Sequence, residues 1–176
     1  MRVIAGSLGG RRIKSPSGHK THPMSDKIRG AIFNMLGDVS GLSLLDAFAG
    51  SGAVGIEAIS RGAQHVTAVD SDKNAHQAIV ENINELKISN SVKAIKANVS
   101  SWSDNNPDKL YDILICDPPY NKIQPKLLNS LGRHVKSGSL AVYSLPPNSN
   151  FQPDLEFTEI AAKDYGDAAI VIYRRN

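Results

Sequence analysis

A glycine-rich segment near residue 50 constrains the fold of this chain more than any other feature. It follows the apolar run 42–48 and opens a helical pattern. Gly50, Gly52 and Gly55 match the pattern G-x-G-x-x-G, and Asp70 ends the next apolar run. In such a loop the glycines let the backbone approach a ligand, and the acid binds ribose hydroxyls. The pattern therefore predicts a nucleotide-type ligand, and taken alone it fits nicotinamide and S-adenosylmethionine enzymes about equally.

Asp46, which precedes the glycines, separates these two classes. A dinucleotide places its pyrophosphate against the loop, where a carboxylate would repel it. S-adenosylmethionine instead has a cationic amino group and a sulfonium, which a carboxylate attracts. We therefore expect S-adenosylmethionine as the cofactor. The alternative, an Asp that only caps the following turn, stays open.

Two further polar residues follow neighbouring strands and are candidates for the same site. Asp70 would bind the ribose, although it could also cap a helix, a role open to Ser71 or Asp72. The amide oxygen of Asn98 can accept from the adenine amino group, or Asn98 is an ordinary turn residue. The expected cofactor site comprises Asp46, Phe48, Ala49, Gly50, Ser51, Gly52, Gly55, Asp70, Ser71, Asn98 and Val99.

From residue 42 onward, strand-like runs alternate with helical patterns. The expected strands are 42–48, 64–69, 92–97, 111–116, 139–144, 156–163 and 168–174, and the expected helices are 53–60, 73–87 and 125–135. A polar connector is expected over 101–108, and a turn at 164–167 joins the last two strands as an antiparallel pair. The alternation predicts an α/β, Rossmann-like, doubly wound sheet of seven mostly parallel strands, with its ligand beyond the strands' carboxyl ends.

The first 40 residues differ from the rest of the chain. They predict a small β-hairpin from 2–5 and 11–14, a loop, and a helix over 25–36 that Ser25 caps. This segment has a net charge of +5, whereas the whole chain has +3. A basic end on a mildly acidic body fits contact with a polyanion, but a solvated basic surface explains the charge equally well.

The chain totals fit one domain that contains a packed core. With 176 residues, we expect a single unit in which 1–24 form the hairpin and loop and 25–176 form the helix and the core. The single cysteine, Cys116, allows neither an internal disulfide nor a multi-cysteine metal site, and no metal is expected. No apolar run approaches the roughly 20 residues that cross a bilayer, and no signal peptide is evident, so a cytoplasmic protein is expected.

The strand over 111–116 leads into the tetrapeptide Asp117, Pro118, Pro119 and Tyr120. An exocyclic amine on a base is a poor nucleophile, because its lone pair is delocalised into the ring. The Asp117 carboxylate and the Pro118 carbonyl could hold the two N–H groups out of plane and localise that lone pair. The prolines keep the local carbonyls rigid, and Tyr120 could stack on the base. These four residues are the expected catalytic group, although the string also occurs as a simple turn.

Taken together, these segments resemble the bacterial 16S rRNA guanine-N2 methyltransferase D family, which acts on small-subunit rRNA. The resemblance covers nearly the whole chain and rests on residues 1–6, 10–12, 23–34, 46–55 and 60–63 together with the tetrapeptide. It implies a class I methyltransferase fold, S-adenosylmethionine as cofactor, and methylation of one guanine N2 in 16S rRNA. The RNA could be free or part of a partly assembled small subunit.

The resemblance also implies that the N-terminal hairpin and helix contact RNA. The expected RNA-binding residues are Arg2, Arg11, Arg12, Lys14, Lys20, His22 and Arg29. Four positions depart from the family pattern. His22 and Met24 flank Pro23 where Arg and Thr are usual, Gly30 replaces a common Glu, and Asn98 replaces a common Asp.

Three alternatives differ in substrate or in class. An adenine-N6 methyltransferase on RNA or DNA would use the same tetrapeptide, but a DNA enzyme normally carries a target-recognition segment, for which the connectors are too short. A nicotinamide oxidoreductase is disfavoured by Asp46 and the tetrapeptide. A binding protein with a decayed active site is disfavoured because Asp46, Asp70 and Asp117 are all present.

Overall fold

The structure is a computed structural model that describes residues 1–18, 24–154 and 156–176. The expected helix after Ser25 and the alternation of strands and helices are both present. In chain order the elements are α1 (Asp26–Leu36), β1 (Ser43–Asp46), α2 (Ala53–Ser60), β2 (His65–Asp70), α3 (Lys73–Glu85), β3 (Val92–Lys96), α4 (Val99–Asp104), β4 (Tyr111–Cys116), the 3-10 helix η1 (Tyr120–Lys122), α5 (Pro125–Gly132), β5 (Val135–Leu145), β6 (Phe157–Asp164) and β7 (Ala169–Arg175).

Within the described residues, the strands form one seven-stranded sheet in the order β3-β2-β1-β4-β5-β7-β6. β1 to β5 run parallel, whereas β7 pairs antiparallel with both β5 and β6. The strand order reverses between β1 and β4, which is where ligands bind in open α/β sheets. The predicted doubly wound sheet with an antiparallel C-terminal pair is confirmed.

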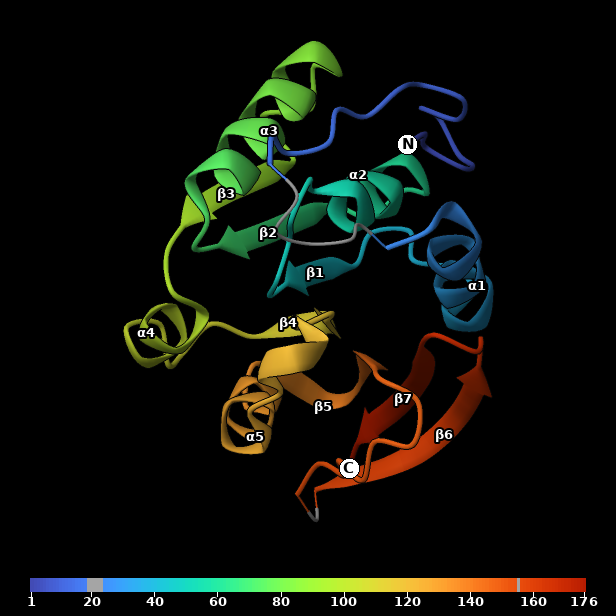
Figure 1. Ribbon diagram of the computed structural model, residues 1–176, viewed down its shortest axis with the longest axis vertical. Coiled ribbons are helices and arrows are strands. Elements are labelled where there is room, and N and C mark those ends of the chain that lie inside the picture. Colours follow the sequence, from blue (N-terminus) through green and yellow to red (C-terminus); the bar gives the residue numbers. More distant parts are fainter. Residues whose placement is uncertain (19–23, 155) are drawn as a thin grey trace.

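Helices cover both faces of the sheet, as Figure 1 shows. On one face, α1, α2 and α3 contribute Ile32, Val54 and Ile79 to a buried cluster with the strands. On the other face, α4 and α5 contribute Trp102 and Leu128 to a second cluster. The alternation of side chains along the strands separates the two clusters, so each face has its own apolar core.

The predicted N-terminal hairpin is reduced to a single antiparallel bridge between Arg2 and Arg12. The Val3 N–H donates to the Arg11 carbonyl over 2.9 Å, and Val3 and Ile13 are buried against α2 and the end of α3. The hairpin therefore packs on the core through its apolar residues, while its arginines stay at the surface.

Two expectations about local structure are wrong. Residues 101–104 of the expected polar connector belong to α4, because the Asn98 side chain caps the first turn of this helix and its Trp102 side chain is buried. The expected helix over 125–135 ends at Gly132, and β5 begins at Val135 instead of residue 139. Val135 is fully buried beside Tyr111, so packing against β4 overrides the polar stretch that follows it.

None of the helices in the described residues is both long and apolar enough to cross a membrane.

Candidate active site

A cavity of about 810 Å³ opens at the carboxyl ends of β1, β2, β3, β4 and β5. It brings together most of the residues predicted from sequence, although they come from distant segments. The predicted residues in its wall are Asp46, Phe48, Ala49, Gly50, Ser51, Asp70, Ser71, Asn98, Val99, Asp117, Pro118, Pro119 and Tyr120. The expected cofactor residues and the expected catalytic residues therefore face one common space.

Asp46 ends β1 at the bottom of this cavity and is only 1% exposed. Its Oδ2 atom is buried and has no hydrogen-bond partner among the described residues. Burial, and then the charges of Asp117 and Asp70, raises the pKa of Asp46 to about 7. A buried acceptor without a partner costs stability unless a ligand supplies a donor or a positive charge. Asp46 is thus suited to a cationic ligand.

Gly50 shapes the loop that follows β1. It adopts a left-handed conformation with φ of 54°, and an added Cβ would meet no atom within 4 Å, so the cavity comes directly up to its backbone. The Gly50 N–H donates to Asp70 Oδ2 over 2.8 Å, which joins the ends of β1 and β2. The other oxygen of the Asp70 carboxylate, Oδ1, accepts from the Asp72 N–H.

Two predicted cofactor residues, Gly52 and Gly55, are not in the cavity wall. Gly52 directly precedes α2, and Gly55 lies within the helix. A Cβ at Gly55 would stand 2.8 Å from Val66 Cγ1, so the glycine allows α2 to pack closely on β2. Their expected contact with the cofactor stays a prediction, and in the structure they set the turn and the helix–sheet packing.

Of the polar residues that follow β2 and β3, some cap helices and others remain available to a ligand. Asp72 caps α3 by accepting from the N–H groups of Asn74 and Ala75, which leaves Asp70 free of that task. Burial raises the pKa of Asp70 above its usual value. The Asn98 amide oxygen accepts from the Ser100 and Ser101 N–H groups as the cap of α4. That oxygen is already used, so the predicted acceptor role of Asn98 is weakened even though the residue lines the cavity.

The tetrapeptide lies where β4 ends, and β4 is the parallel neighbour of β1, which leads into the glycine loop. Burial raises the pKa of Asp117 to about 6, and a hydrogen bond from the Ser144 hydroxyl partly offsets this. The Tyr120 and Ser144 hydroxyls share a hydrogen bond of 2.8 Å. Tyr120 is 38% exposed, so its ring is available at the cavity mouth for contact with a planar group.

Several cavity residues were not predicted from sequence. They come from the start of α1, the region after the tetrapeptide, β5 and the turn before β7, and include Met24, Ile28, Lys122, Ser144, Asp167 and Ala168. The turn at 164–167 is recognisable in the sequence, but its approach to the site depends on the antiparallel pairing of β7 with β5.

The expected RNA-binding residues fall into three groups. Arg2, Arg11 and Arg12 are exposed on the hairpin, and Lys14 is exposed but paired with Glu85 at 3.2 Å. Two of the predicted residues, at positions 20 and 22, lie outside the described residues.

Arg29 contradicts the prediction, because its side chain is fully buried. It donates to the carbonyl of Arg2 and to Asp26 Oδ1, and its Nε atom lies 3.8 Å from Glu57 Oε2. Its guanidinium fastens the hairpin to α1 and α2 and is inaccessible to phosphates.

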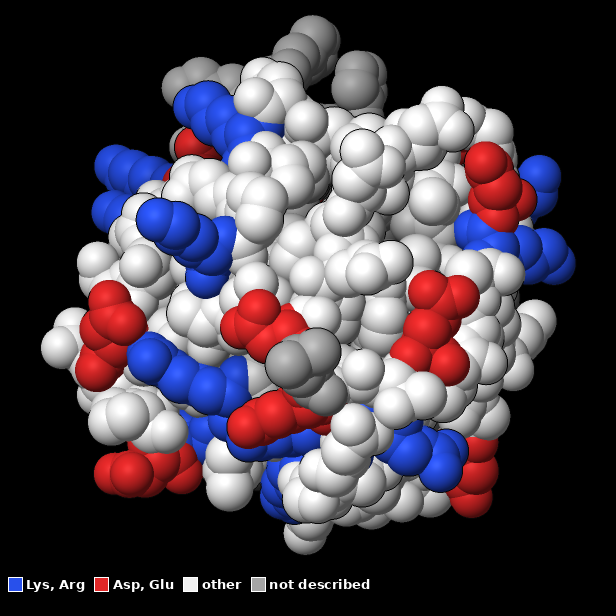
Figure 2. All heavy atoms as spheres, turned by 90° about the horizontal axis from the view of Figure 1, so that it is seen from below, with Lys and Arg blue, Asp and Glu red and all other residues white. Residues whose placement is uncertain are grey.

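The opposite end of the molecule, which carries β6 and the C-terminus, has mixed charge (Figure 2). Blue and red side chains alternate over this face and leave no broad area of one sign in view. Ion pairs that involve β7 and the residue after α5 join Arg175 with Glu156 at 2.9 Å and Arg133 with Asp104 at 3.0 Å. This mixed charge differs from the hairpin, where Arg2, Arg11 and Arg12 are all exposed.

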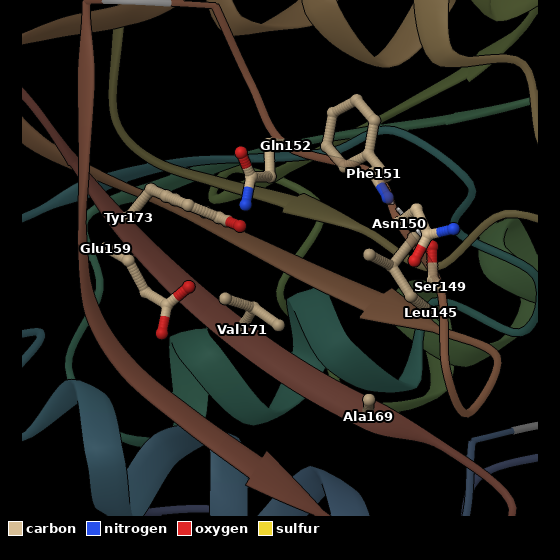
Figure 3. A pocket seen from close by; sticks show the side chains of 9 residues that line it. All are labelled: Leu145, Ser149, Asn150, Phe151, Gln152, Glu159, Ala169, Val171 and Tyr173. Carbon is tan, nitrogen blue, oxygen red and sulfur yellow. Dashed lines mark hydrogen bonds between the residues drawn. The ribbon is translucent and has the colours of Figure 1, made fainter.

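A second, smaller cavity of about 390 Å³ lies beside β7, on the face that α5 covers (Figure 3). Leu145, Phe151 and Val171 form its apolar wall. The polar ends of Gln152 and Tyr173 point toward one another, with Glu159 beside them. None of the predicted site residues lines this cavity.

In the described part of the chain, no group of three or more His, Cys, Asp or Glu side chains could hold a metal ion. Cys116 is buried directly before the tetrapeptide, and burial and the charges of Asp46 and Asp117 raise the pKa of its thiol.

Comparison with known proteins places this fold and site in a class. The solved structure of the Escherichia coli protein yhhF aligns over 100% of this chain and 98% of its own length, with a TM-score of 0.89 and 26% identity. A tRNA m1G37 methyltransferase from M. jannaschii aligns over 96% of this chain and 59% of its own, with a TM-score of 0.72 and 18% identity. The strand order and the cavity at its switch point thus define a Rossmann-like methyltransferase fold.

The sequence comparisons identify the family. The family described as "Conserved hypothetical protein 95" matches residues 1–174. The ribosomal RNA small subunit methyltransferase D of Buchnera aphidicola is 37% identical over 131 residues, which are 73% of this chain and 68% of that protein. The chain belongs to the ribosomal RNA small subunit methyltransferase D family.

Proposed function

We propose that this protein transfers a methyl group from S-adenosylmethionine to the exocyclic N2 amine of a guanine in 16S rRNA. One observation carries the proposal: Asp46, a buried carboxylate whose Oδ2 has no hydrogen-bond partner, lines the same cavity as the Asp117 tetrapeptide. A buried carboxylate that lacks a partner suits a cationic cofactor, and a second carboxylate nearby suits an amine. Membership of an rRNA methyltransferase family supports RNA as the substrate.

The residues of the cavity fit this cofactor. Asp46 would attract its positive charge, Asp70 would accept from the ribose hydroxyls, and the open space above Gly50 would admit a closely packed ligand. Phe48 and Val99 supply apolar wall on either side. When bound, the cofactor supplies an electrophilic methyl group.

The tetrapeptide prepares the amine. The Asp117 carboxylate and the Pro118 carbonyl would accept from its two N–H groups and localise the nitrogen lone pair. With a pKa of about 6, Asp117 is mostly ionised at pH 7 and can act as this acceptor. As the new N–C bond would form, the S–C bond of the methyl donor would break and S-adenosylhomocysteine would leave as a neutral thioether. The nitrogen would then be positively charged and acidic, and Asp117 can take the released proton.

Positioning provides most of the expected rate enhancement. Tyr120 would stack on the flipped base, a contact worth about 1–3 kcal/mol, and its hydrogen bond to Ser144 holds the ring in place. The target amine in a duplex is paired, so the base must come from a loop or be flipped. The exposed arginines of the hairpin would hold the flanking phosphates.

The test is methylation of 16S rRNA by purified protein and labelled S-adenosylmethionine, with nucleosides identified by mass spectrometry. We expect N2-methylguanosine, at one site, from free rRNA or from assembled small subunits, and running both shows which substrate is used. N6-methyladenosine as the product would replace this proposal with the adenine alternative. Binding of NAD without binding of S-adenosylmethionine would overturn the cofactor assignment.

A further inference from the structure

The turn between β6 and β7 adds a second acidic side chain to the substrate end of the cavity. β7 runs antiparallel to β5, and Ala169 at its start pairs with Leu145 at the end of β5. The turn is therefore brought to the edge of the sheet where β4 and β5 end. As a result, Asp167 lines the same cavity as Asp117 and Tyr120.

The position of Asp167 is set by a structured turn. The Asp164 carboxylate accepts from the Gly166 N–H over 2.6 Å, and the Tyr165 N–H donates to the Ala168 carbonyl over 2.8 Å. Ala168, directly after Asp167, is only 2% exposed and packs in the core. The backbone on both sides of Asp167 is thus held by hydrogen bonds or by packing.

The Asp167 side chain itself is available to a ligand. The residue is exposed, and the ion pairs found among the described residues do not include it. Its charge reaches Tyr120, whose hydroxyl has a pKa raised by burial and, to a smaller extent, by Asp117 and Asp167. Asp117 and Asp167 therefore line the same cavity as Tyr120, and the charges of both reach its hydroxyl.

We propose that Asp167 determines specificity by accepting a hydrogen bond from N1–H of the target guanine, while Asp117 holds the neighbouring amine. This inference rests on the proposed function and deepens it. Guanine has a donor at N1 beside its amine, whereas adenine has an acceptor lone pair at N1. An ionised carboxylate accepts and cannot donate, so it favours guanine and repels bases with an acceptor at that position.

The test uses a purine that keeps the reacting amine but changes N1. 2-Aminopurine retains the C2 amine, but its N1 is an acceptor, and it lacks the guanine oxygen. A short RNA containing the target site, with either guanine or 2-aminopurine there, is methylated by the wild type and by Asp167→Asn. Asn can turn its NH₂ group toward an acceptor N1. Because both proteins meet the same pair of bases, the effect of the missing oxygen cancels in the comparison.

We expect the wild type to prefer guanine by about 100-fold or more in kcat/KM, because a mismatched polar group is left buried without a partner. In Asp167→Asn this preference should shrink by at least about tenfold. Glu159→Gln, an acid of β6 that lines the other cavity, serves as the matched control and should keep the wild-type preference.

An unchanged preference in Asp167→Asn would overturn the inference, whether the activity of this variant stays at the wild-type level or falls equally on both RNAs while binding of S-adenosylhomocysteine stays intact. A loss of that binding would point to a structural role instead and would equally count against specificity. Failure of the proposed function looks different, because the wild type would then place no methyl group on guanine N2 in free 16S rRNA or in assembled small subunits either.

Discussion

Two buried carboxylates, one in the fold and one in the candidate site, differ in whether their oxygens have partners within the chain. Glu57 on α2 is fully buried, and its two oxygens accept from the N–H groups of Ile4 and Ala5 and from Arg61. The guanidinium of Arg29 lies beside it as well. Asp46, equally inaccessible, has an oxygen with no partner.

The difference separates an acid that completes the fold from an acid that awaits a ligand. The Glu57 carboxylate contacts the hairpin, α1 and the end of α2, so groups of the protein itself compensate its charge. Asp46 instead lies near Asp117 and Asp70, both of its own sign, which raises its pKa. Burial without compensation costs stability and is retained where it serves binding.

The largest expected effect comes from removing a cation that compensates the charge of Glu57. Arg29→Met removes a buried cation and leaves Glu57 with excess negative charge, so the free energy of unfolding should fall by about 3–5 kcal/mol. Urea denaturation followed by circular dichroism measures this. Lys27→Met, an exposed change on the same helix, should shift it by less than about 0.5 kcal/mol. Equal effects of the two changes would remove Arg29 from this structural role.

The second prediction concerns the acid that faces the amine. Asp117→Ala should lower the single-turnover rate of methyl transfer by about 100-fold or more, since it removes an acceptor used in the transition state. Binding of S-adenosylhomocysteine, measured by calorimetry, should stay within about threefold of wild type. Asp108→Ala, an exposed acid, is the control. A large loss of cofactor affinity would mean that Asp117 belongs to the cofactor site.

The third prediction tests the unpartnered acid directly. Asp46→Asn keeps the shape but removes the charge, so the affinity for S-adenosylmethionine should fall by about tenfold or more, which corresponds to about 1.4 kcal/mol. Calorimetry at pH 8 is the measurement, with Asp108→Asn as control. Wild-type affinity in Asp46→Asn would show that the charge is not used in binding.

The fourth prediction uses the pH dependence of stability. The pKa of Asp46 is raised to about 7 in the folded protein, so between about pH 4 and 7 the folded state holds a proton that the unfolded state has lost. The free energy of unfolding should therefore decrease as pH rises through this range, by about 1.4 kcal/mol for each pH unit at most. Cofactor-free Asp46→Asn should lose less stability than the wild type between pH 5 and 8. Parallel pH curves for the two proteins would contradict the raised pKa.

The smallest expected effect concerns the surface of the hairpin. Arg11→Gln and Arg12→Gln should each weaken RNA binding a few-fold and reduce the slope of log affinity against log salt by about one. Filter binding at several salt concentrations measures this. Lys93→Gln, exposed on β3, is the matched control, and an equal effect there would indicate diffuse attraction with no defined contact at the hairpin.

The sequence predicts the sheet well and local boundaries less well. The seven strands and their order in the chain follow from short-range apolar patterns, which burial on a sheet requires. α4 was missed because its helix depends on one cap, Asn98, and on Trp102 reaching the core. Neither contact is a property of the polar stretch itself.

The site divides in the same way. The presence of Asp46, Gly50, Asp70 and Asp117 in one cavity could be predicted, because each lies at or just after the carboxyl end of a strand. Arg29 was assigned wrongly, since charge alone does not reveal burial beside Glu57.

The glycine loop and its neighbouring acids thus follow from the sequence by themselves, because strand, turn and helix are local and the parallel ends must meet at one edge. Only the tertiary structure decides that the charge of Glu57 is compensated within the protein, whereas an oxygen of Asp46 has no hydrogen-bond partner. It also decides that Asp167 joins the site, since an antiparallel strand carries that turn back beside Tyr120. Pairing between strands distant in the chain sets these contacts, and no local pattern encodes it.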